Sequence, residues 1–163
     1  NLGIVKNVIG TIRQPEFVIC DTTMLRTLPE KEYMSGLAEL IKTGLIGDRT
    51  IPETLEDKMA GVIRRDRALL TDLVFRSVKV KAGVVARDEK ESGLRRILNF
   101  GHTFGHAIEL SEGISHGFAV AAGMELAALF SFRKGYLGEK DYSRISMLLR
   151  SLGYPLDIKI PAG

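Results

Sequence analysis

A chain of 163 residues with 45% hydrophobic side chains is long enough to bury the core of one domain. Its 23 Lys and Arg against 20 Asp and Glu give a formal net charge of +3 without blocks of like charge, which suits an anionic small substrate better than nucleic acid. Cys20 is the only cysteine, so an internal disulfide and a cysteine-based metal cluster are excluded, and any metal site must use nitrogen and oxygen ligands.

The apolar stretches and the first residues of the chain indicate its cellular location and whether it is part of a longer protein. No apolar stretch approaches the roughly twenty residues of a membrane span, and the opening residues lack the order of a signal peptide, so we expect a soluble, cytoplasmic protein that does not engage a membrane. The chain starts without Met, in residues typical of a loop. We therefore expect a piece of a longer protein.

The first predicted elements are one strand and one helix. Residues 17–20, FVIC, are β-branched and aromatic residues between Pro15 and Asp21, which favours a short buried strand. Thr27, an early proline and Glu30 then predict a helix start with Thr27 as N-cap. This helix is expected to run to about Ile46.

The rest of the chain is predicted to be helical. One or two short helical pieces follow Pro52, and a long helix covers 71–87. After the polar turn DEKESG, helices are expected at 94–111, 117–134 and 139–152, the last two separated by Gly135 and Gly138. The predicted fold class is mainly α, a helical bundle with one short N-terminal strand.

The predicted helix 94–111 carries the most chemistry. Its polar side chains Arg95, Asn99, His102 and His106 fall within about 60° of one another on a helical wheel and indicate a polar cleft. A His-x3-His pair is by itself more often structural than catalytic, and Thr103 after the first His excludes the HExxH zinc motif. His116, after the next loop, could return to the same cleft as a third nitrogen ligand.

Two lysines leave alternatives open. Glu39 and Lys42 are spaced for a solvated ion pair, but the apolar neighbours of Glu39 also fit a buried carboxylate that binds a metal. Lys81 lies within an apolar stripe of the helix 71–87, formed by Leu70, Val74, Val78 and Val85. It either extends from the core edge to solvent or points into a cleft to hold an anion. Arg95 would suit a planar carboxylate.

Several segments together resemble the second half of the 3-dehydroquinate synthase family. They are KNVIGTIRQP, LPEKEYMSGLAELIKTGLI, KAGVVARDEKESGLRRILNFGHTFGHAIE and HGFAVAAGM, in the family's order and across nearly the whole chain. The resemblance implies a C-terminal, metal- and substrate-binding portion of an α/β plus α enzyme, truncated at both ends. Residues 1–26 would be a remnant of the nucleotide-binding domain and linker, and residues 27–163 the helical domain.

The resemblance also implies an activity. The family is NAD- and metal-dependent and acts in the shikimate pathway of aromatic amino acid biosynthesis. It is a carbon–oxygen lyase that converts 3-deoxy-D-arabino-heptulosonate 7-phosphate to 3-dehydroquinate and phosphate. NAD⁺ would be bound mainly by the missing N-terminal domain, so we expect this chain to be inactive alone. The intact enzyme would be a homodimer without a nucleic-acid partner.

Site residues are carried over at matching positions. The metal ligands implied for Zn²⁺ or Co²⁺ are Glu39, His102 and His116. The implied catalytic residues are His106, Glu91, Lys81, Arg95 and Asn99. The implied substrate-binding residues are Lys6, Asn7, Lys42, Lys81, Arg95, Asn99 and His106.

Three departures from the family pattern stand out, and three other functions stay open. The glycine-rich GGG and GGK segments and the last helices with their late lysine are absent, and Phe118 replaces the usual Glu of HGEAVA.

Two alternative enzymes are a related sugar phosphate cyclase and a metal-dependent alcohol or glycerol dehydrogenase. A basic helical binding module, suggested by RRDR at 64–67 and a pI near 9.1, is the non-enzyme alternative; its affinity would fall with salt and would not need His102.

Overall fold

The computed structural model describes residues 13–156, and in this range the chain is entirely helices and connecting segments. The helices are, in chain order, η1 (Thr22–Arg26), α1 (Glu30–Gly47), α2 (Thr50–Asp57), α3 (Met59–Ile63), α4 (Arg67–Arg87), η2 (Leu94–Asn99), α5 (His102–Glu112), α6 (His116–Arg133) and α7 (Glu139–Ser151). None of them combines the length and apolar composition that crossing a bilayer requires.

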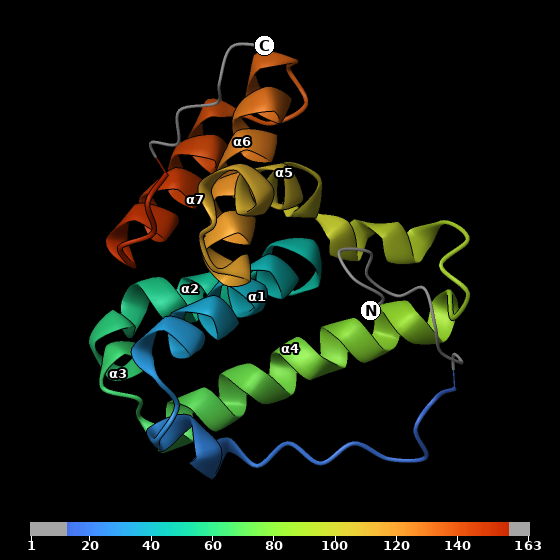
Figure 1. Cartoon of the computed structure of the whole chain (residues 1–163), viewed down its shortest axis with the longest axis vertical. Helices are drawn as coiled ribbons and strands as arrows, with labels where there is room; N and C mark the ends of the chain where they lie inside the picture. The colour runs from blue at the N-terminus through green and yellow to red at the C-terminus, as the bar shows by residue number, and fades with distance from the viewer. Residues whose placement is uncertain (1–12, 157–163) are drawn as a thin grey trace.

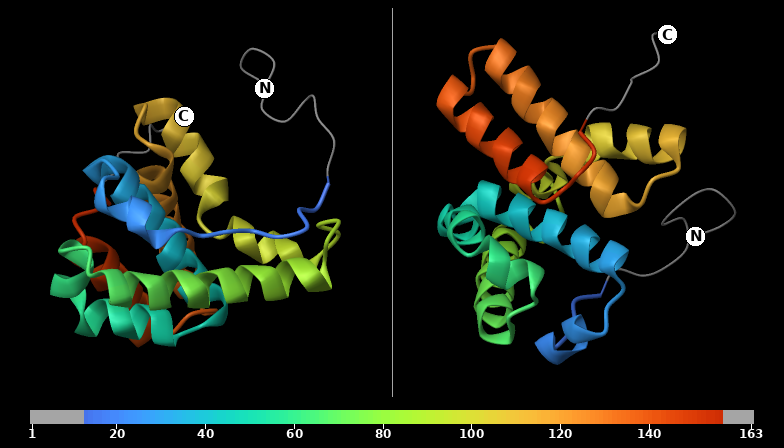
Figure 2. Two further views of the ribbon diagram at one scale, coloured as in Figure 1. Left: turned by 90° about the horizontal axis from the view of Figure 1, so that it is seen from below. Right: turned by 90° about the vertical axis from the view of Figure 1, so that its left-hand side faces the viewer.

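Helix α1 lies at the centre of the molecule, in contact with α4 on one side and α6 on the other (Figures 1 and 2). Because it is covered from two sides, its middle is buried around most of its circumference, from Leu37 to Gly44, including the polar Lys42 and Thr43. The largest fully buried side chains come from α1 and five other helices and are Ile41, Ile51, Leu55, Val62, Leu73, Val120, Met124 and Leu149.

Small residues let α6 approach its neighbours closely. A Cβ added at Gly117 would lie 2.2 Å from Ser35 Cα in α1, and one added at Gly123 would lie 2.0 Å from the Gly101 carbonyl oxygen before α5. Real Cβ atoms do not approach other atoms this closely, so neither position has room for a side chain. The segment HGFAVAAGM therefore sets how near the three helices stand.

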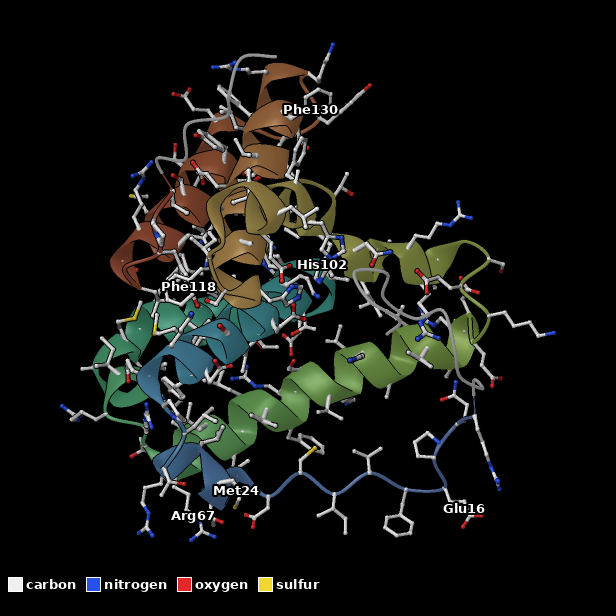
Figure 3. All side chains as sticks on the ribbon, viewed as in Figure 1. Glu16, Met24, Arg67, His102, Phe118 and Phe130 are labelled. Atoms are coloured by element: carbon white, nitrogen blue, oxygen red, sulfur yellow. The ribbon has the colours of Figure 1, made fainter. Side chains whose placement is uncertain are left out.

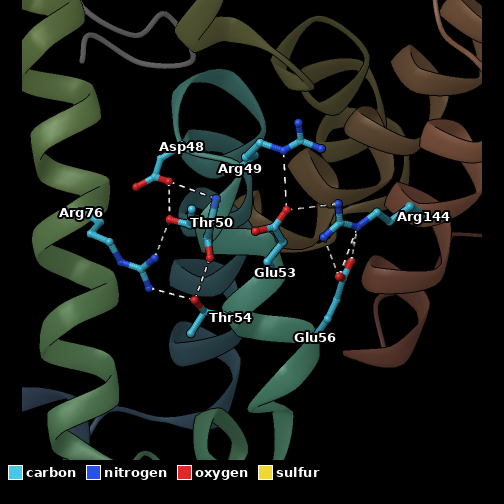
Figure 4. Close-up of polar contacts among 8 residues, drawn as sticks. All are labelled: Asp48, Arg49, Thr50, Glu53, Thr54, Glu56, Arg76 and Arg144. Carbon is cyan, nitrogen blue, oxygen red and sulfur yellow. Dashed lines mark hydrogen bonds and ion pairs between the residues drawn. The ribbon is translucent and has the colours of Figure 1, made fainter.

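Two arginines connect the short helix α2 to its neighbours (Figure 4). Arg76 of α4 donates to Thr50 Oγ1 at 2.8 Å and to Thr54 Oγ1 at 3.1 Å. Arg144 of α7 forms a bidentate ion pair with Glu56, with its shortest N···O distance 2.7 Å. Bidentate pairs fix geometry as well as charge, so α2 is held between α4 and α7.

The mainly helical fold class is confirmed, but the predicted strand at residues 17–20 is wrong. These residues are in an extended segment without strand structure, and Phe17, Val18 and Ile19 are 75%, 70% and 80% exposed. A strand needs a neighbouring strand for its backbone hydrogen bonds, and residues 13–156 offer none.

The predicted continuous helix 94–111 is also wrong. The chain forms the 3₁₀-helix η2, turns through an extended Phe100 and a left-handed Gly101 with φ of +79°, and only then starts α5. Glycine adopts positive φ without the Cβ penalty, so Gly101 ends one helix and begins another in a new direction (Figure 2). Thr27, predicted as the N-cap of α1, instead ends η1, and Pro29 precedes α1 without a side-chain cap.

Candidate metal and substrate site

Three potential metal ligands from three helices converge in the centre of the molecule. Glu39 comes from the middle of α1, His102 from the first position of α5, and His116 from the first position of α6. His102 is labelled in Figure 3 where α1, α5 and η2 meet. Glu39 Oε1 lies 3.6 Å from His102 Nε2 and 3.9 Å from His116 Nε2.

One oxygen of the Glu39 carboxylate accepts a hydrogen bond, and the other does not. Its Oε2 accepts a 2.6 Å hydrogen bond from Lys42 Nζ, and the lysine is buried. Its Oε1 is buried without a hydrogen-bond partner and is the oxygen that faces the two imidazoles. A buried carboxylate oxygen without a partner is costly, which a cation between it and the two nitrogens would relieve.

The distances from Glu39 Oε1 to the two imidazole nitrogens fit Zn²⁺ or Co²⁺. Ligand atoms about 2.1 Å from a tetrahedral ion stand about 3.4 Å apart, and cannot be more than about 4.2 Å apart. The two measured distances from Glu39 Oε1 lie inside that limit. Two imidazole nitrogens and one carboxylate with room for further ligands is a donor set typical of catalytic zinc.

The far nitrogens of both imidazoles are also held. His102 Nδ1 lies 3.4 Å from the Phe100 carbonyl oxygen, and His116 Nδ1 lies 3.1 Å from Glu109 Oε2. Such acceptors place the proton on Nδ1 and leave Nε2 free to bind a metal. Burial, with the nearby Lys42 charge, lowers the pKa of His102, which favours the neutral imidazole that metals require.

A pocket of about 290 Å³ opens beside the three ligands. The side chains that line it come from α1, α4, α5, α6, η2 and the turn before η2, and are Glu39, Lys42, Thr43, Lys81, Glu91, Arg95, Leu98, Asn99, His102 and His116. Its lining carries three cations, Lys42, Lys81 and Arg95, against the two carboxylates of Glu39 and Glu91. This combination of cations next to a metal-ligand cluster suits an anionic, oxygen-rich ligand.

The turn after α4 and the helix η2 together supply four of the ten lining residues, Glu91, Arg95, Leu98 and Asn99. Asn99 Nδ2 donates to Glu91 Oε1 at 3.1 Å, and the Arg95 guanidinium donates to the Glu89 carbonyl oxygen at 2.7 Å. Glu91 has a left-handed backbone, with φ of +56°. The side chains that were predicted to share one helical stripe therefore come from two helices, Arg95 and Asn99 from η2 and His102 and His106 from α5.

Most residues predicted for the site are brought together, with two qualifications on position. Lys81 lines the pocket, but the apolar stripe predicted around it is wrong, because Val78 is 43% exposed and the buried residues of α4 are Leu70, Leu73 and Val84. His106 is exposed and lies beside the pocket, its ring 5.5 Å from that of His102 and 6.1 Å from that of His116. Lys6 and Asn7 lie outside the described residues.

Some residues of the site were missed from sequence. Thr43 lines the pocket and pairs its hydroxyl with Ser77 at 2.6 Å, and Glu109 contacts His116. Glu109 lies seven residues after His102, which is two helical turns, and this spacing could have indicated that the two side chains share one face of the helix. Phe118, in place of the family's usual Glu, packs edge-on against Tyr154 with 5.5 Å between ring centroids and joins the core.

Two family models and many proteins of known name match this chain. A family model described as 3-dehydroquinate synthase C-terminal matches residues 36–162, and one described as 3-dehydroquinate synthase N-terminal matches residues 1–35. Proteins named 3-dehydroquinate synthase from Nitrosospira multiformis and Acidithiobacillus ferrooxidans are 48% and 50% identical over 154 and 153 residues. These alignments cover 93% and 92% of this chain and 42% of each relative, so the chain spans about two fifths of their length.

Solved structures of related enzymes share the fold. A 2-deoxy-scyllo-inosose synthase complexed with carbaglucose-6-phosphate, NAD⁺ and Co²⁺ superposes with a TM-score of 0.82 at 36% identity, covering 100% of this chain and 45% of that one. A 2-epi-5-epi-valiolone synthase from Streptomyces hygroscopicus, with NAD⁺ and Zn²⁺ bound, superposes with a TM-score of 0.77 at 28% identity, covering 86% of this chain and 40% of that one.

Proposed function

This chain belongs to the 3-dehydroquinate synthase family, and we propose that it forms the metal- and substrate-binding half of an enzyme that converts 3-deoxy-D-arabino-heptulosonate 7-phosphate to 3-dehydroquinate and phosphate. The observation that carries the proposal is the partnerless Glu39 Oε1, which faces His102 and His116 at the edge of a cationic pocket. Neither a core ion pair nor a basic binding surface would need that arrangement.

Glu39, His102 and His116 would hold Zn²⁺ or Co²⁺, the metals bound in the two structural relatives. When bound, the metal would act as a Lewis acid that lowers the pKa of substrate hydroxyls and polarises a ketone. NAD⁺ would be bound mainly by the nucleotide-binding domain outside this chain, and would supply reversible hydride transfer.

The chain's own residues would bind and orient the substrate. Arg95, with a guanidinium anchored at Glu89, would pair with the substrate carboxylate through two parallel hydrogen bonds. Lys81 would neutralise a nearby oxyanion, and Asn99 would contact hydroxyl groups. His106 and Glu91 would move protons at the open side of the pocket. Holding one flexible substrate through several steps would supply much of the rate.

Lys42 would have two contacts in this scheme. It is the partner of Glu39 Oε2, and it also lines the pocket. By holding one carboxylate oxygen, it would keep the other directed at the metal position, and its remaining ammonium protons could bind a substrate oxygen. Lys6 and Asn7, on the matching phosphate-side loop, would add contacts to the phosphate.

The N-terminal and C-terminal family models meet between residues 35 and 36, inside α1, and we propose a division in the segment before α1. Residues 1–26 would be the end of the nucleotide-binding domain and its linker, and residues 27–163 the helical domain. The exposed apolar residues 17–19 fit a segment that the rest of the intact enzyme covers. The homodimeric state, the cytoplasmic location and the inactivity of the isolated chain stay predictions.

The direct test uses the intact protein that contains this chain, supplied with NAD⁺ and Zn²⁺ or Co²⁺. We expect phosphate release from 3-deoxy-D-arabino-heptulosonate 7-phosphate, with 3-dehydroquinate as the carbon product. Glucose 6-phosphate, which lacks a carboxylate, is the control substrate and should not react. Turnover of glucose 6-phosphate alone would instead support a related sugar phosphate cyclase, and salt-sensitive nucleic-acid binding without turnover would support the basic binding module.

A further inference from the structure

The segment from Ala86 to Asn99 has an unusual distribution of burial. Of these residues, all of which the structure describes, only Asp88 is buried, with 8% of its surface exposed. The same segment supplies Glu91, Arg95 and Asn99 to the pocket. Because its residues 89–94 are all exposed, apolar packing cannot be what orders that turn.

Polar contacts to Asp88 replace that packing. Its Oδ1 accepts from the Ser92 amide at 2.8 Å and from the Ser92 hydroxyl at 3.0 Å. Its Oδ2 accepts from the Gly93 amide at 2.8 Å and from the Arg95 amide at 3.0 Å. The Arg95, Gly93 and Ser92 hydrogen bonds hold the pKa of Asp88 far below its usual range, so the carboxylate stays ionised and acceptor-only near neutral pH.

These contacts link the C-terminal end of α4 to the pocket. Asp88 directly follows the last residue of α4, and the amides that it binds span the turn up to the second residue of η2. Arg95 is fixed twice, by its own amide on Asp88 and by its guanidinium on the Glu89 carbonyl oxygen. Glu91, inside the same loop of hydrogen bonds, receives the Asn99 amide at 3.1 Å.

We propose that Asp88 is a positioning residue for substrate binding, which sets the place of Arg95 and of the Glu91–Asn99 pair by closing the turn that carries them. Its carboxylate does not line the pocket, so it acts through these residues and not on the substrate. The metal ligands come from α1, α5 and α6, so Asp88 should control substrate affinity and leave metal affinity unchanged. The substrate part of this role rests on the proposed function.

Asp88→Asn tests the proposal with little change in shape. The asparagine side chain has one oxygen and one NH₂ group in place of the two carboxylate oxygens. Whichever way it is turned, the NH₂ group faces backbone N–H donors, either those of Gly93 and Arg95 or that of Ser92, so the hydrogen bonds of only one oxygen are kept. In the intact enzyme we expect KM for the heptulosonate phosphate to rise about tenfold or more, with a smaller change in kcat. Hydrogen exchange of the Ser92, Gly93 and Arg95 amides should accelerate, and Zn²⁺ affinity should stay at the wild-type value.

Two variants separate the specific effect of Asp88 from a general loss of stability. Ser92→Ala removes one of the four hydrogen bonds and should give a shift smaller than Asp88→Asn. Asp48→Asn alters a second aspartate whose Oδ1 accepts from a backbone amide, that of Thr50 at the start of α2, away from the pocket, and should leave KM unchanged.

An equal KM shift in Asp48→Asn, or unchanged exchange of the three amides in Asp88→Asn, would overturn the proposal. If the wild-type enzyme releases no phosphate, the proposed function fails separately. The exchange measurement would then still decide whether Asp88 holds the turn.

Discussion

Gly123→Ala should damage the metal site from a distance, through the contact between α6 and the start of α5. The new Cβ would lie 2.0 Å from the Gly101 carbonyl oxygen, whereas carbon and oxygen normally approach to about 3.3 Å. One of the two backbones must therefore move by about 1.3 Å. Gly101 directly precedes His102, so the movement is passed to a predicted metal ligand.

The consequence for the metal can be estimated from the ligand spacing. His102 Nε2 lies 3.6 Å from Glu39 Oε1, and two atoms on one Zn²⁺ cannot stand more than about 4.2 Å apart. A displacement of about 1.3 Å along that line exceeds the limit, so we expect Zn²⁺ affinity to fall by about tenfold to hundredfold. Overpacking should also cost about 1–3 kcal/mol of stability, against about 1 kcal/mol gained in helix propensity.

The assay is competition for Zn²⁺ with a chromophoric chelator, combined with thermal unfolding of the metal-free protein. Gly83→Ala is the matched control, because Gly83 is also inside a helix and a Cβ there would meet nothing within 4 Å. It should bind Zn²⁺ normally and be slightly more stable. Wild-type Zn²⁺ affinity in Gly123→Ala would refute the proposed coupling between the close helix contact and the ligand geometry.

Two further predictions concern single contacts. Glu109→Ala removes the acceptor for His116 Nδ1 and should lower Zn²⁺ affinity by about tenfold or more. Leu110→Ala is the control on the same helix: Leu110 is 88% exposed, and its replacement should leave Zn²⁺ affinity unchanged. Burial raises the pKa of Tyr33 to about 12 from 10.0, so its contribution to stability is complete below pH 10 and is lost as pH rises through about 12. Denaturant unfolding between pH 8 and 12 should show a loss of about 2 kcal/mol from this group, reduced in Tyr33→Phe; an unchanged pH profile in that variant would contradict the assignment.

The sequence predicted the helices better than the turns between them. The helices predicted at residues 71–87 and 117–134 are present as α4 (Arg67–Arg87) and α6 (His116–Arg133), with ends that differ by at most four residues. α6 buries a nearly continuous run of small and apolar residues, whereas α4 buries only Leu70, Leu73 and Val84. The predicted helix 94–111 continued through Gly101, where a left-handed glycine ends η2 and starts α5. Local spacing could not show this break, since the reason for it is the close contact with Gly123 in another helix.

The site shows the same division between local and long-range information. Arg95, Asn99 and His102 were predicted to lie together because they share one face of a continuous helix. That helix does not exist, yet the structure brings the three side chains together around one pocket. Spacing left Glu39 undecided between an ion pair with Lys42 and a metal ligand. The structure shows the ion pair on one oxygen and a partnerless second oxygen, so both readings describe part of the same carboxylate. Asp88 could not be recognised from sequence, because its partners are backbone amides.

The central claim is that Glu39, His102 and His116 bind one cation. Calorimetric titration of the metal-free protein with Zn²⁺ tests it most directly, using Glu39→Ala, His102→Ala, His116→Ala and, as the neighbouring control, His106→Ala. We predict one Zn²⁺ per chain, a loss of about hundredfold or more in affinity for each of the first three variants, and nearly wild-type affinity for the fourth. Unchanged binding in Glu39→Ala, or equal losses in all four variants, would contradict the account.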